Sequence, residues 1–403
     1  MLTLKDITKA QERLKDVIYK TPLAHAPLLS ELTGYEVYLK KENLQRTGSF
    51  KLRGAFNKIA SIISKGNKKG VVAASAGNHA QGVAFGAKYF NIDATIFMPE
   101  ATPLTKVQGV ESLGAKVVLK GNNYDEAYAH ALEYAKENSL EFVHPFADEE
   151  VMAGQGTIFL EIYEELKDLD ALVVPIGGGG LISGVATAAK SLLDDIEIIG
   201  VSAAGAPAMK KSYDLGKPID TTYVRTIADG IAVRDTDPKM LEYIKKLVDK
   251  YELVSDDEIA SAILFLLEKQ KLLVEGAGAA GVAALMHNHL DIPKGSKVVI
   301  VVSGGNIDVT MLSLIIEKGL VKSSRKMKLV VTLVDKPGAL EQFASLMRQV
   351  NANIVQIGYD RTSTDLEFGD ANVSVALETR GYEHQEEIRK ILKEHGFKFQ
   401  ELH

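Results

Sequence analysis

The chain contains no cysteine and no tryptophan among its 403 residues. The absence of cysteine excludes disulfide bonds, thiolate metal sites and a cysteine nucleophile. No uncharged apolar stretch approaches the roughly 18 residues that a membrane-spanning helix needs, and the opening segment 1–6 lacks the apolar core of a signal peptide. A net charge of −6 and the lack of a basic tract argue against a nucleic-acid partner. We therefore expect a cytoplasmic protein that binds neither nucleic acid nor membrane.

Apolar strands that alternate with helices make up most of the sequence. A first series of expected strands is followed by a second series, and the intervening segments have the length and periodicity of helices. Strands and helices in this alternation are typical of βαβ units and a parallel sheet. The sequence therefore predicts an α/β fold, with strands at 35–39, 70–74, 93–98, 116–119, 171–176, 196–201 and 297–302.

The pattern changes near the polar, basic stretch 320–328. Beyond it, a β-α-β-β-α order within a short segment predicts a small ferredoxin-like α+β module. We therefore expect a main domain over 1–320, a linker over 321–327 and a second domain over 328–403. Within the main domain, we expect a small lobe over about 45–145 and a large lobe formed by the remainder.

Lys51 lies within the stretch Gly48–Ala55, at the expected start of a helix that Ser49 can cap. The positive end of a helix dipole disfavours an ammonium group. An amine that loses its proton can react with the aldehyde of a cofactor. The alternative is a solvated lysine on a surface helix, and this stretch by itself favours that alternative.

Three apolar strands end in loops of small residues that precede helices, at 75–79, 177–181 and 303–306. In open α/β sheets, ligands bind beyond the carboxyl ends of the strands. Four consecutive glycines, Gly177 to Gly180, allow several backbone N–H groups to converge on a phosphate at a helix start. The loop is not a Walker motif, because no Gly-Lys-Ser/Thr follows. The alternative is a tight strand–helix turn that uses glycine for close packing.

The other two loops offer polar side chains. The Ser75–His79 loop combines backbone donors, a hydroxyl and an amide, which suits a carboxylate and a phenolic oxygen, although Ser75 can also be a simple helix cap. A hydroxyl at Ser303 can hydrogen-bond a pyridine nitrogen, or again cap a helix. His79 and His144 show no paired spacing, and no carboxylate cage is evident, so the sequence predicts no metal site.

Taken in order, these motifs resemble those of the pyridoxal-phosphate-dependent threonine dehydratases, which have the tryptophan-synthase-β-like fold (fold type II). The resemblance covers about residues 5–320. The tail 327–403 resembles an ACT regulatory domain. The resemblance depends on Ser49–Ala55, Ser75–Gly82, Gly177–Leu181 and Ser303–Asn306, and in the tail on Asp335–Gly338 and Asn353-Ile354.

The resemblance implies a role for each of these residues. Lys51 would hold pyridoxal 5'-phosphate covalently and act as the catalytic base and acid. Phe50 would lie against the cofactor ring, and Asn78 would bind its phenolic oxygen. Ser303 would contact the ring nitrogen. The phosphate would be bound by Gly177, Gly178, Gly179, Gly180 and Leu181; Gly230 and Glu275 would lie near the ring; and the substrate carboxylate would be received by Ser75, Ala76, Gly77, Asn78 and His79.

The implied reaction converts L-threonine, and more weakly L-serine, into an oxo acid and ammonia; for threonine the oxo acid is 2-oxobutanoate. Serine racemases of the same fold carry a second serine where this chain has Ala76, and an acidic metal ligand where it has Gly205. Both departures favour dehydration over racemisation and argue against Mg²⁺. Serine dehydratase, racemase and hydroxyaspartate lyase activities remain alternatives on the same scaffold, and a non-catalytic amino-acid sensor is an alternative of a different class.

The resemblance of the tail implies an effector site for isoleucine or valine at Asp335, Gly338, Asn353 and Ile354. The alternative is a module that only mediates dimerisation. ACT modules usually pair, so we expect a homodimer or a homotetramer. The sequence leaves open whether the role is isoleucine biosynthesis or threonine catabolism.

Overall fold

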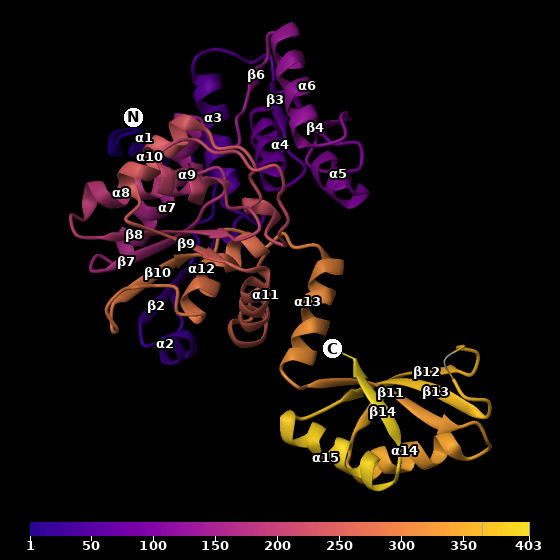
Figure 1. Cartoon of the computed structure of the whole chain (residues 1–403). Helices are drawn as coiled ribbons and strands as arrows, with labels where there is room; N and C mark the ends of the chain where they lie inside the picture. The colour runs from indigo at the N-terminus through magenta and orange to yellow at the C-terminus, as the bar shows by residue number, and fades with distance from the viewer. Residues whose placement is uncertain (365, 403) are drawn as a thin grey trace. The chain divides into compact units, whose positions relative to one another are not determined.

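The computed structural model describes residues 1–364 and 366–402, and the chain divides into two units, Met1–Asp308 and Val309–His403 (Figure 1). Within those described ranges, no helix is long and apolar enough to cross a bilayer. Each unit has its own sheet or sheets and its own apolar core. The two units are described separately below.

The large lobe of the first unit is built on a six-stranded sheet in the order β1-β2-β10-β7-β8-β9. All neighbours are parallel except β1, which runs antiparallel to β2. Helices cover both faces of the sheet (Figure 1). The strands are β1 Leu23–His25, β2 Glu36–Lys40, β7 Ala171–Pro175, β8 Glu197–Ala203, β9 Lys250–Val254 and β10 Lys297–Val301, and the helices are α1 Leu4–Leu14, α2 Pro27–Thr33, α7 Glu149–Glu165, α8 Gly180–Leu192, α9 Ala208–Leu215, α10 Pro238–Leu247, α11 Asp256–Phe265 and α12 Gly276–Met286.

The small lobe has a four-stranded, fully parallel sheet in the order β5-β4-β3-β6. Apolar side chains bury one face of this sheet against α3 and α4, and the other face against α6. These two sheets, one parallel throughout and one parallel except for β1, confirm the predicted α/β class. The elements are α3 Lys51–Ser64, β3 Val71–Ala74, α4 Asn78–Phe90, β4 Ala94–Met98, α5 Leu104–Glu111, β5 Lys116–Leu119, α6 Tyr124–Glu137 and β6 Glu141–Phe142.

Glycines bring α3, α7 and α8 into close contact, and these helices join the two lobes. A Cβ atom at Gly154 would lie 2.4 Å from the Arg53 carbonyl oxygen, and one at Gly184 would lie 2.1 Å from the Met152 carbonyl oxygen. No side chain fits in either place, so the helix backbones touch directly. Because α3 also packs on α4, it fixes the small lobe to the scaffold of the large lobe.

Several local predictions are wrong. Helix α3 begins at Lys51, but Ser49 does not cap it, because its hydroxyl is buried without a hydrogen-bond partner among the described residues. The backbone of Ser49 instead forms a β-bridge with Gly304. Helix α10 ends at Leu247, and strand β9, which is missing from the predicted strands, follows it. Strands β1 and β6 were also missed, because segments of 2 or 3 residues are too short to show alternation.

The second unit begins with helix α13 and continues as an antiparallel sheet in the order β12-β13-β11-β14, with α14 and α15 packed on it. The missed strand β14 completes a ferredoxin-like β-α-β-β-α-β order. The end of α13 and the start of β11 occupy the range predicted as a linker, 321–327. The elements are α13 Val309–Lys322, β11 Lys326–Val334, α14 Ala339–Gln349, β12 Asn353–Asp360, β13 Asp370–Glu378, α15 Tyr382–Glu394 and β14 Lys398–Leu402.

Candidate active site

A cavity of ≈ 940 Å³ lies in the first unit, next to the loops that follow β3, β7 and β10. Each residue that the sequence predicted to contact a cofactor or substrate lines this cavity. Strands β7 and β10 are parallel neighbours in the large-lobe sheet, so their carboxyl ends lie side by side. Strand β3 belongs to the small-lobe sheet, and the loop at its carboxyl end lines the same cavity from the other lobe. The structure therefore brings the predicted residues together, while their individual roles remain proposals.

Lys51 is the first residue of α3, and its side chain reaches into the cavity. Its Nζ donates to the Pro145 carbonyl oxygen at 2.9 Å and lies 5.3 Å from the centre of the Phe50 ring. Burial lowers the pKa of Lys51 to about 8, although the nearby Glu275 carboxylate opposes this shift. A pKa near 8 leaves roughly a quarter of the amine neutral at pH 7.5, against ~0.1% for an ordinary lysine. Lys51 can therefore act as a nucleophile or a base.

Asn78 and Glu275 face each other across the cavity. The Asn78 Nδ2 atom donates to the two Glu275 carboxylate oxygens at 2.9 and 3.0 Å. The Asn306 Nδ2 atom donates to the Asn78 Oδ1 atom at 2.8 Å and so fixes the orientation of the amide. Burial raises the pKa of Glu275 to about 7, and the hydrogen bond from Asn78 limits that rise. In this structure, the Asn78 amide nitrogen therefore donates to the Glu275 carboxylate.

The raised pKa of Glu275 predicts a pH dependence of stability. Native Glu275 holds its proton up to about pH 7, whereas the unfolded chain loses it near pH 4.5, so the free energy of unfolding should fall as pH rises through this window. Glu275→Gln should remove this fall, worth about 2–3 kcal/mol. Urea unfolding of the apoprotein at pH 5 and pH 8 measures it, with the exposed Glu111→Gln as control. Parallel pH profiles for parent and Glu275→Gln would contradict the assignment.

The glycine loop Gly177–Gly180 packs closely against neighbouring residues and also leaves the start of α8 without a side-chain cap. A Cβ atom at Gly178 or Gly180 would lie 2.4 or 2.8 Å from Phe146, and one at Gly177 would lie 2.9 Å from the Ile231 Cα atom. The close-packing interpretation is therefore correct. Gly179 has a φ of +90°, and no side chain caps the start of α8, which leaves its first N–H groups open to an anion. Leu181, in the first turn of α8, also lines the cavity.

The loop before α4 presents Ser75, Ala76 and Gly77 to the cavity. Ser75 does not cap the helix: Gly77 is the cap residue, and the Ser75 Oγ atom accepts from the Gly77 N–H at 3.2 Å. The Nε2–H of His79 donates to the Val143 carbonyl oxygen at 2.8 Å. Burial lowers the pKa of His79 to about 3, so its ring is neutral.

Two further predicted residues, Ser303 and Gly230, lie next to Phe50 and Glu275, respectively. Ser303 is buried, and its carbonyl oxygen accepts from the Phe50 N–H at 3.1 Å. A Cβ atom at Gly230 would lie 3.2 Å from a Glu275 carboxylate oxygen, so glycine allows this loop to approach the carboxylate.

The connection from β6 to α7 supplies cavity residues that the sequence did not reveal. The His144 Nδ1 atom accepts backbone N–H groups of Phe146 and Ala147 at 3.2 and 2.8 Å. Burial lowers the pKa of His144 to about 4, so the ring is neutral and its Nε2–H is a donor. Pro145 contributes the carbonyl group that holds Lys51. A strand prediction at 141–142 would have placed this loop at the cavity, but β6 has only 2 residues.

Comparison with known proteins decides the family. A family model described as "Pyridoxal-phosphate dependent enzyme" matches residues 14–304.

The chain belongs to this pyridoxal-phosphate-dependent family.

A relative from Thermotoga maritima, L-threonine ammonia-lyase, is 50% identical over 397 residues, which cover 98% of each chain. Among solved structures, the chain is similar to the processed threonine deaminase isoform 2 from Solanum lycopersicum, with a TM-score of 0.74, 40% identity, and coverage of 78% of this chain and 91% of that one. It is also similar to maize serine racemase, with a TM-score of 0.74, 33% identity, and coverage of 80% and 98%. These likenesses confirm the predicted fold type II and the predicted cofactor.

The cavity residues fit the cofactor of this family. Lys51 offers a buried amine to the aldehyde group, and the open start of α8 offers N–H groups to the phosphate. Ser303 lines the same cavity and would offer a neutral hydroxyl to the ring nitrogen. When bound, pyridoxal phosphate stabilises negative charge that develops on the substrate Cα atom. The remaining steps depend on the side chains around it.

Two ion pairs join the small lobe to the large lobe at the lining of the cavity. Asp125 of α6 pairs with Arg234 of the large lobe, and Lys106 of α5 pairs with Asp229 at 3.3 Å. All four residues line the cavity. Their side chains are exposed, so each pair contributes little to stability. They place charges of both signs on the lining of the cavity.

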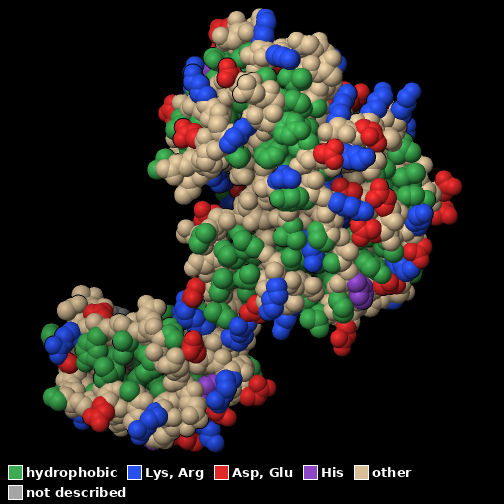
Figure 2. All heavy atoms as spheres, turned by 180° about the vertical axis from the view of Figure 1, so that it is seen from behind, with side chains coloured by type: hydrophobic (Ala, Val, Ile, Leu, Met, Phe, Trp, Pro, Cys, Tyr) green, Lys and Arg blue, Asp and Glu red, His purple; other side chains and the backbone are tan. Residues whose placement is uncertain are grey.

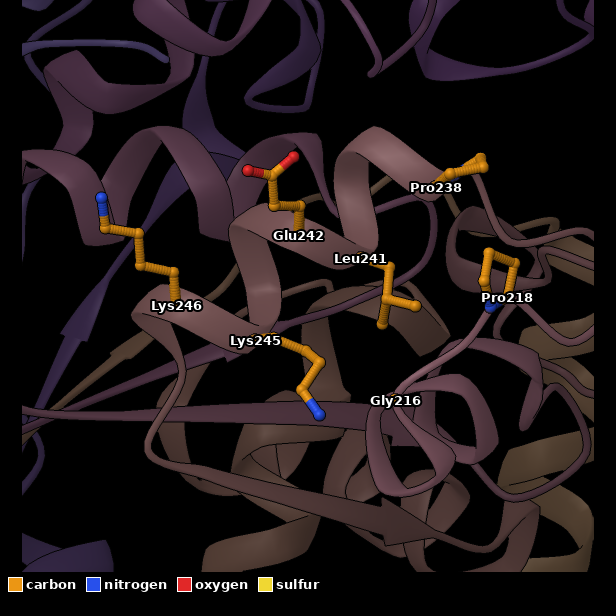
Figure 3. Close-up of a pocket in the computed structure, with 7 residues that line it drawn as sticks. All are labelled: Gly216, Pro218, Pro238, Leu241, Glu242, Lys245 and Lys246. Carbon is orange, nitrogen blue, oxygen red and sulfur yellow. The ribbon is translucent and has the colours of Figure 1, made fainter.

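A second hollow, of ≈ 460 Å³, lies beside α10 (Figure 3). Its three charged residues, Glu242, Lys245 and Lys246, are exposed. Figure 3 shows that Glu242 and Lys246 point away from Lys245 instead of converging on one point. We therefore assign the pyridoxal phosphate site to the larger cavity.

Proposed function

We propose that the protein is an L-threonine ammonia-lyase, which eliminates water from L-threonine to give 2-oxobutanoate and ammonia. The observation that carries the proposal is Lys51, a buried amine of lowered pKa in a cavity that also holds an open helix start for phosphate. The name of the Thermotoga maritima relative, similar over 98% of this chain, supports the same activity. L-Serine is a weaker substrate in this proposal.

In the proposed reaction, the loop Ser75–His79 binds the substrate carboxylate and so orients the Cα–H bond toward Lys51. The neutral Lys51 amine removes the Cα proton, and the resulting ammonium supplies a proton to the β-hydroxyl, which leaves as water. Addition of a water molecule then releases 2-oxobutanoate and ammonia. Ser303 would offer a neutral hydroxyl to the ring nitrogen of the bound cofactor and so would not force that nitrogen to be protonated.

A substrate panel tests the proposal. Purified protein with pyridoxal phosphate is given L-threonine, L-serine, D-serine and hydroxyaspartate, and 2-oxo acids, ammonia and chiral products are quantified. We expect the highest kcat/KM with L-threonine and no racemisation, because Ala76 offers no acid–base group on the opposite face. Formation of D-serine, or a preference for L-serine or hydroxyaspartate over threonine, would overturn the assignment in favour of the racemase, serine dehydratase or hydroxyaspartate lyase alternative.

We further propose that the second unit is an ACT-like regulatory domain over 328–403 that binds isoleucine or valine. In its turn before α14, Asp335 pairs with Arg361 and accepts a hydrogen bond from the Tyr359 hydroxyl at 3.1 Å. Gly338 begins α14 with a φ of +87° and open space around it. The Asn353 Nδ2 atom donates to Glu378 at 2.7 Å, and Ile354 packs on the core. A half-buried carboxylate beside an open glycine supports a site for an amino group.

Effector titration of the full-length enzyme tests this regulatory role. Isoleucine and valine should change threonine turnover in the parent protein and not in Asp335→Ala. Lys390→Ala, which removes an exposed ion pair with Glu394 in the same unit, should keep the response. Absence of any response in the parent would reject regulation and favour a purely structural module; a response would also fit isoleucine biosynthesis better than catabolism.

A homodimer or homotetramer in the cytoplasm is part of the same proposal. The edge strand β12 exposes Val355, Ile357 and Tyr359, each with between 44% and 48% of its surface exposed. Figure 2 shows apolar side chains gathered on the C-terminal unit. An unpaired edge with apolar side chains favours pairing with a second copy. Sedimentation should show an oligomer that Ile357→Lys weakens; a monomeric parent would contradict it.

A further inference from the structure

Four charged side chains form a buried network beneath the start of α3. Arg53, Lys40 and Glu42 are fully buried, and Glu161 is 7% exposed. They come from four elements: α3, β2, the short helix Glu42–Leu44 and α7. The proposed reaction uses none of them. Their formal charges cancel, so the network as a whole is neutral.

Arg53 lies at the centre of this network, and each of its five N–H groups is used. Its Nε and Nη2 atoms donate to the two Glu42 oxygens at 2.8 Å each. Its Nη1 and Nη2 atoms donate to the two Glu161 oxygens at 2.6 and 2.9 Å. The remaining N–H donates to the Thr157 hydroxyl at 3.2 Å. The guanidinium thus makes two bidentate pairs at once, a geometry that a lysine ammonium cannot reproduce.

Lys40 completes the network from the other side. Its Nζ donates to Glu161 at 2.6 Å and to the Thr21 carbonyl oxygen at 2.7 Å. The Thr21 hydroxyl donates to Glu42 at 2.5 Å. Stability alone does not explain such a network, because apolar residues of similar volume are often as stable as a buried ion pair or more so. What the network provides is a fixed geometry among four elements.

That geometry bears directly on the catalytic lysine. Arg53 lies two residues after Lys51, in the same first turn of α3. Glu161 lies on α7, which packs against α8, the helix that begins at the glycine loop. The Arg53 side chain therefore links the first turn of α3, which carries Lys51, to Glu161 on α7. Helix α7 in turn packs against α8, whose start is proposed to bind the cofactor phosphate.

We propose that Arg53 is a positioning residue: its double fork to Glu42 and Glu161 holds the first turn of α3 so that the Lys51 amine meets the cofactor and substrate at a fixed distance. The turnover measurement in its test rests on the proposed function. The spectroscopic measurement requires only that the protein binds the cofactor of its family. A displacement of about 1 Å in a reacting group can cost ~10²-fold in rate.

The test compares Arg53→Lys with Lys58→Gln in the holoenzyme. Lys58 pairs with Asp148 at 2.6 Å, which joins the same two helices, α3 and α7, farther from Lys51. Four quantities are measured: the thermal midpoint, the pH midpoint of the visible absorbance of the lysine-bound cofactor, and kcat and KM for threonine. Thr157→Val, which removes one hydrogen bond from Arg53, is a milder variant should Arg53→Lys fail to fold.

For Arg53→Lys we expect kcat to fall ~10²-fold with KM within about threefold, and the spectroscopic pH midpoint to shift. Thr157→Val should show the same changes at about a tenth of the size. Lys58→Gln should lower the thermal midpoint and leave the spectrum and kcat unchanged. Equal spectra and equal kcat for the Arg53 or Thr157 variant and for Lys58→Gln, well below each thermal midpoint, would overturn the inference. If threonine is not a substrate, the spectral midpoint still decides it.

Discussion

Replacing Lys51 with alanine is expected to abolish threonine turnover, by at least ~10³-fold, while the protein still folds. The Lys51 amine is buried in the cavity, and burial lowers its pKa to about 8. The variant should still bind pyridoxal phosphate through its phosphate, because the start of α8 is unchanged. It should lack the visible absorbance of lysine-bound cofactor, which absorbance spectroscopy and 2-oxobutanoate assays measure.

A matched control separates the role of this amine from the loss of any lysine on α3. Lys65, the exposed residue that follows the last turn of the same helix, should be replaceable by alanine with little change. The pKa of about 8 for Lys51 also determines the direction of a pH dependence. Because the amine is protonated below that pH, the rate at which the apoprotein captures the cofactor's aldehyde should rise with pH and level off above about 8. Substantial threonine turnover by Lys51→Ala would contradict the proposed mechanism.

The sequence allowed the fold class and the residues of the cavity to be predicted because their signals are local. An apolar strand followed by small residues marks the carboxyl end of a parallel strand, as at Gly177–Leu181. The carboxyl ends of β3, β7 and β10 border one cavity from the two sheets, which places Asn78, the glycine loop and Ser303 in its lining. Gly230 and Glu275 line the same cavity, but only the family resemblance pointed to them.

Other features have no local signal. The Pro145 carbonyl group that holds Lys51 is backbone, which every residue carries. Charged residues within a helix, such as Arg53 and Glu161, are usually expected on its solvated face. Only the tertiary packing of α3 on α7 buries these two together. Serine is a common helix-capping residue, but the backbone of Ser49 forms a β-bridge with Gly304 and its hydroxyl lies in the interior. Tertiary contacts override local preference in each case.

The contact between α7 and α8 leads to the largest expected effect on stability. A Cβ atom at Gly184 would lie 2.1 Å from the Met152 carbonyl oxygen, and this atom belongs to the helix backbone, which cannot rotate away as a side chain can. Gly184→Ala must therefore push α8 off α7. We expect a loss of ~3 kcal/mol or more in the free energy of unfolding, at the upper end of overpacked core substitutions. Urea denaturation and soluble yield measure this loss.

Gly109→Ala is the matched control, because Gly109 also lies within a helix, α5, and its Cβ would meet open space. Alanine there should stabilise the protein by about 0.5–1 kcal/mol, through helix propensity and a less flexible unfolded chain. The two variants make the same chemical change, so a difference of opposite sign isolates the helix contact; equal effects would show that α7 and α8 have room between them. Any Gly184→Ala protein that folds should also bind pyridoxal phosphate more weakly than the parent, since the displaced α8 carries the glycine loop with it while Lys51 stays anchored to α7 through Arg53.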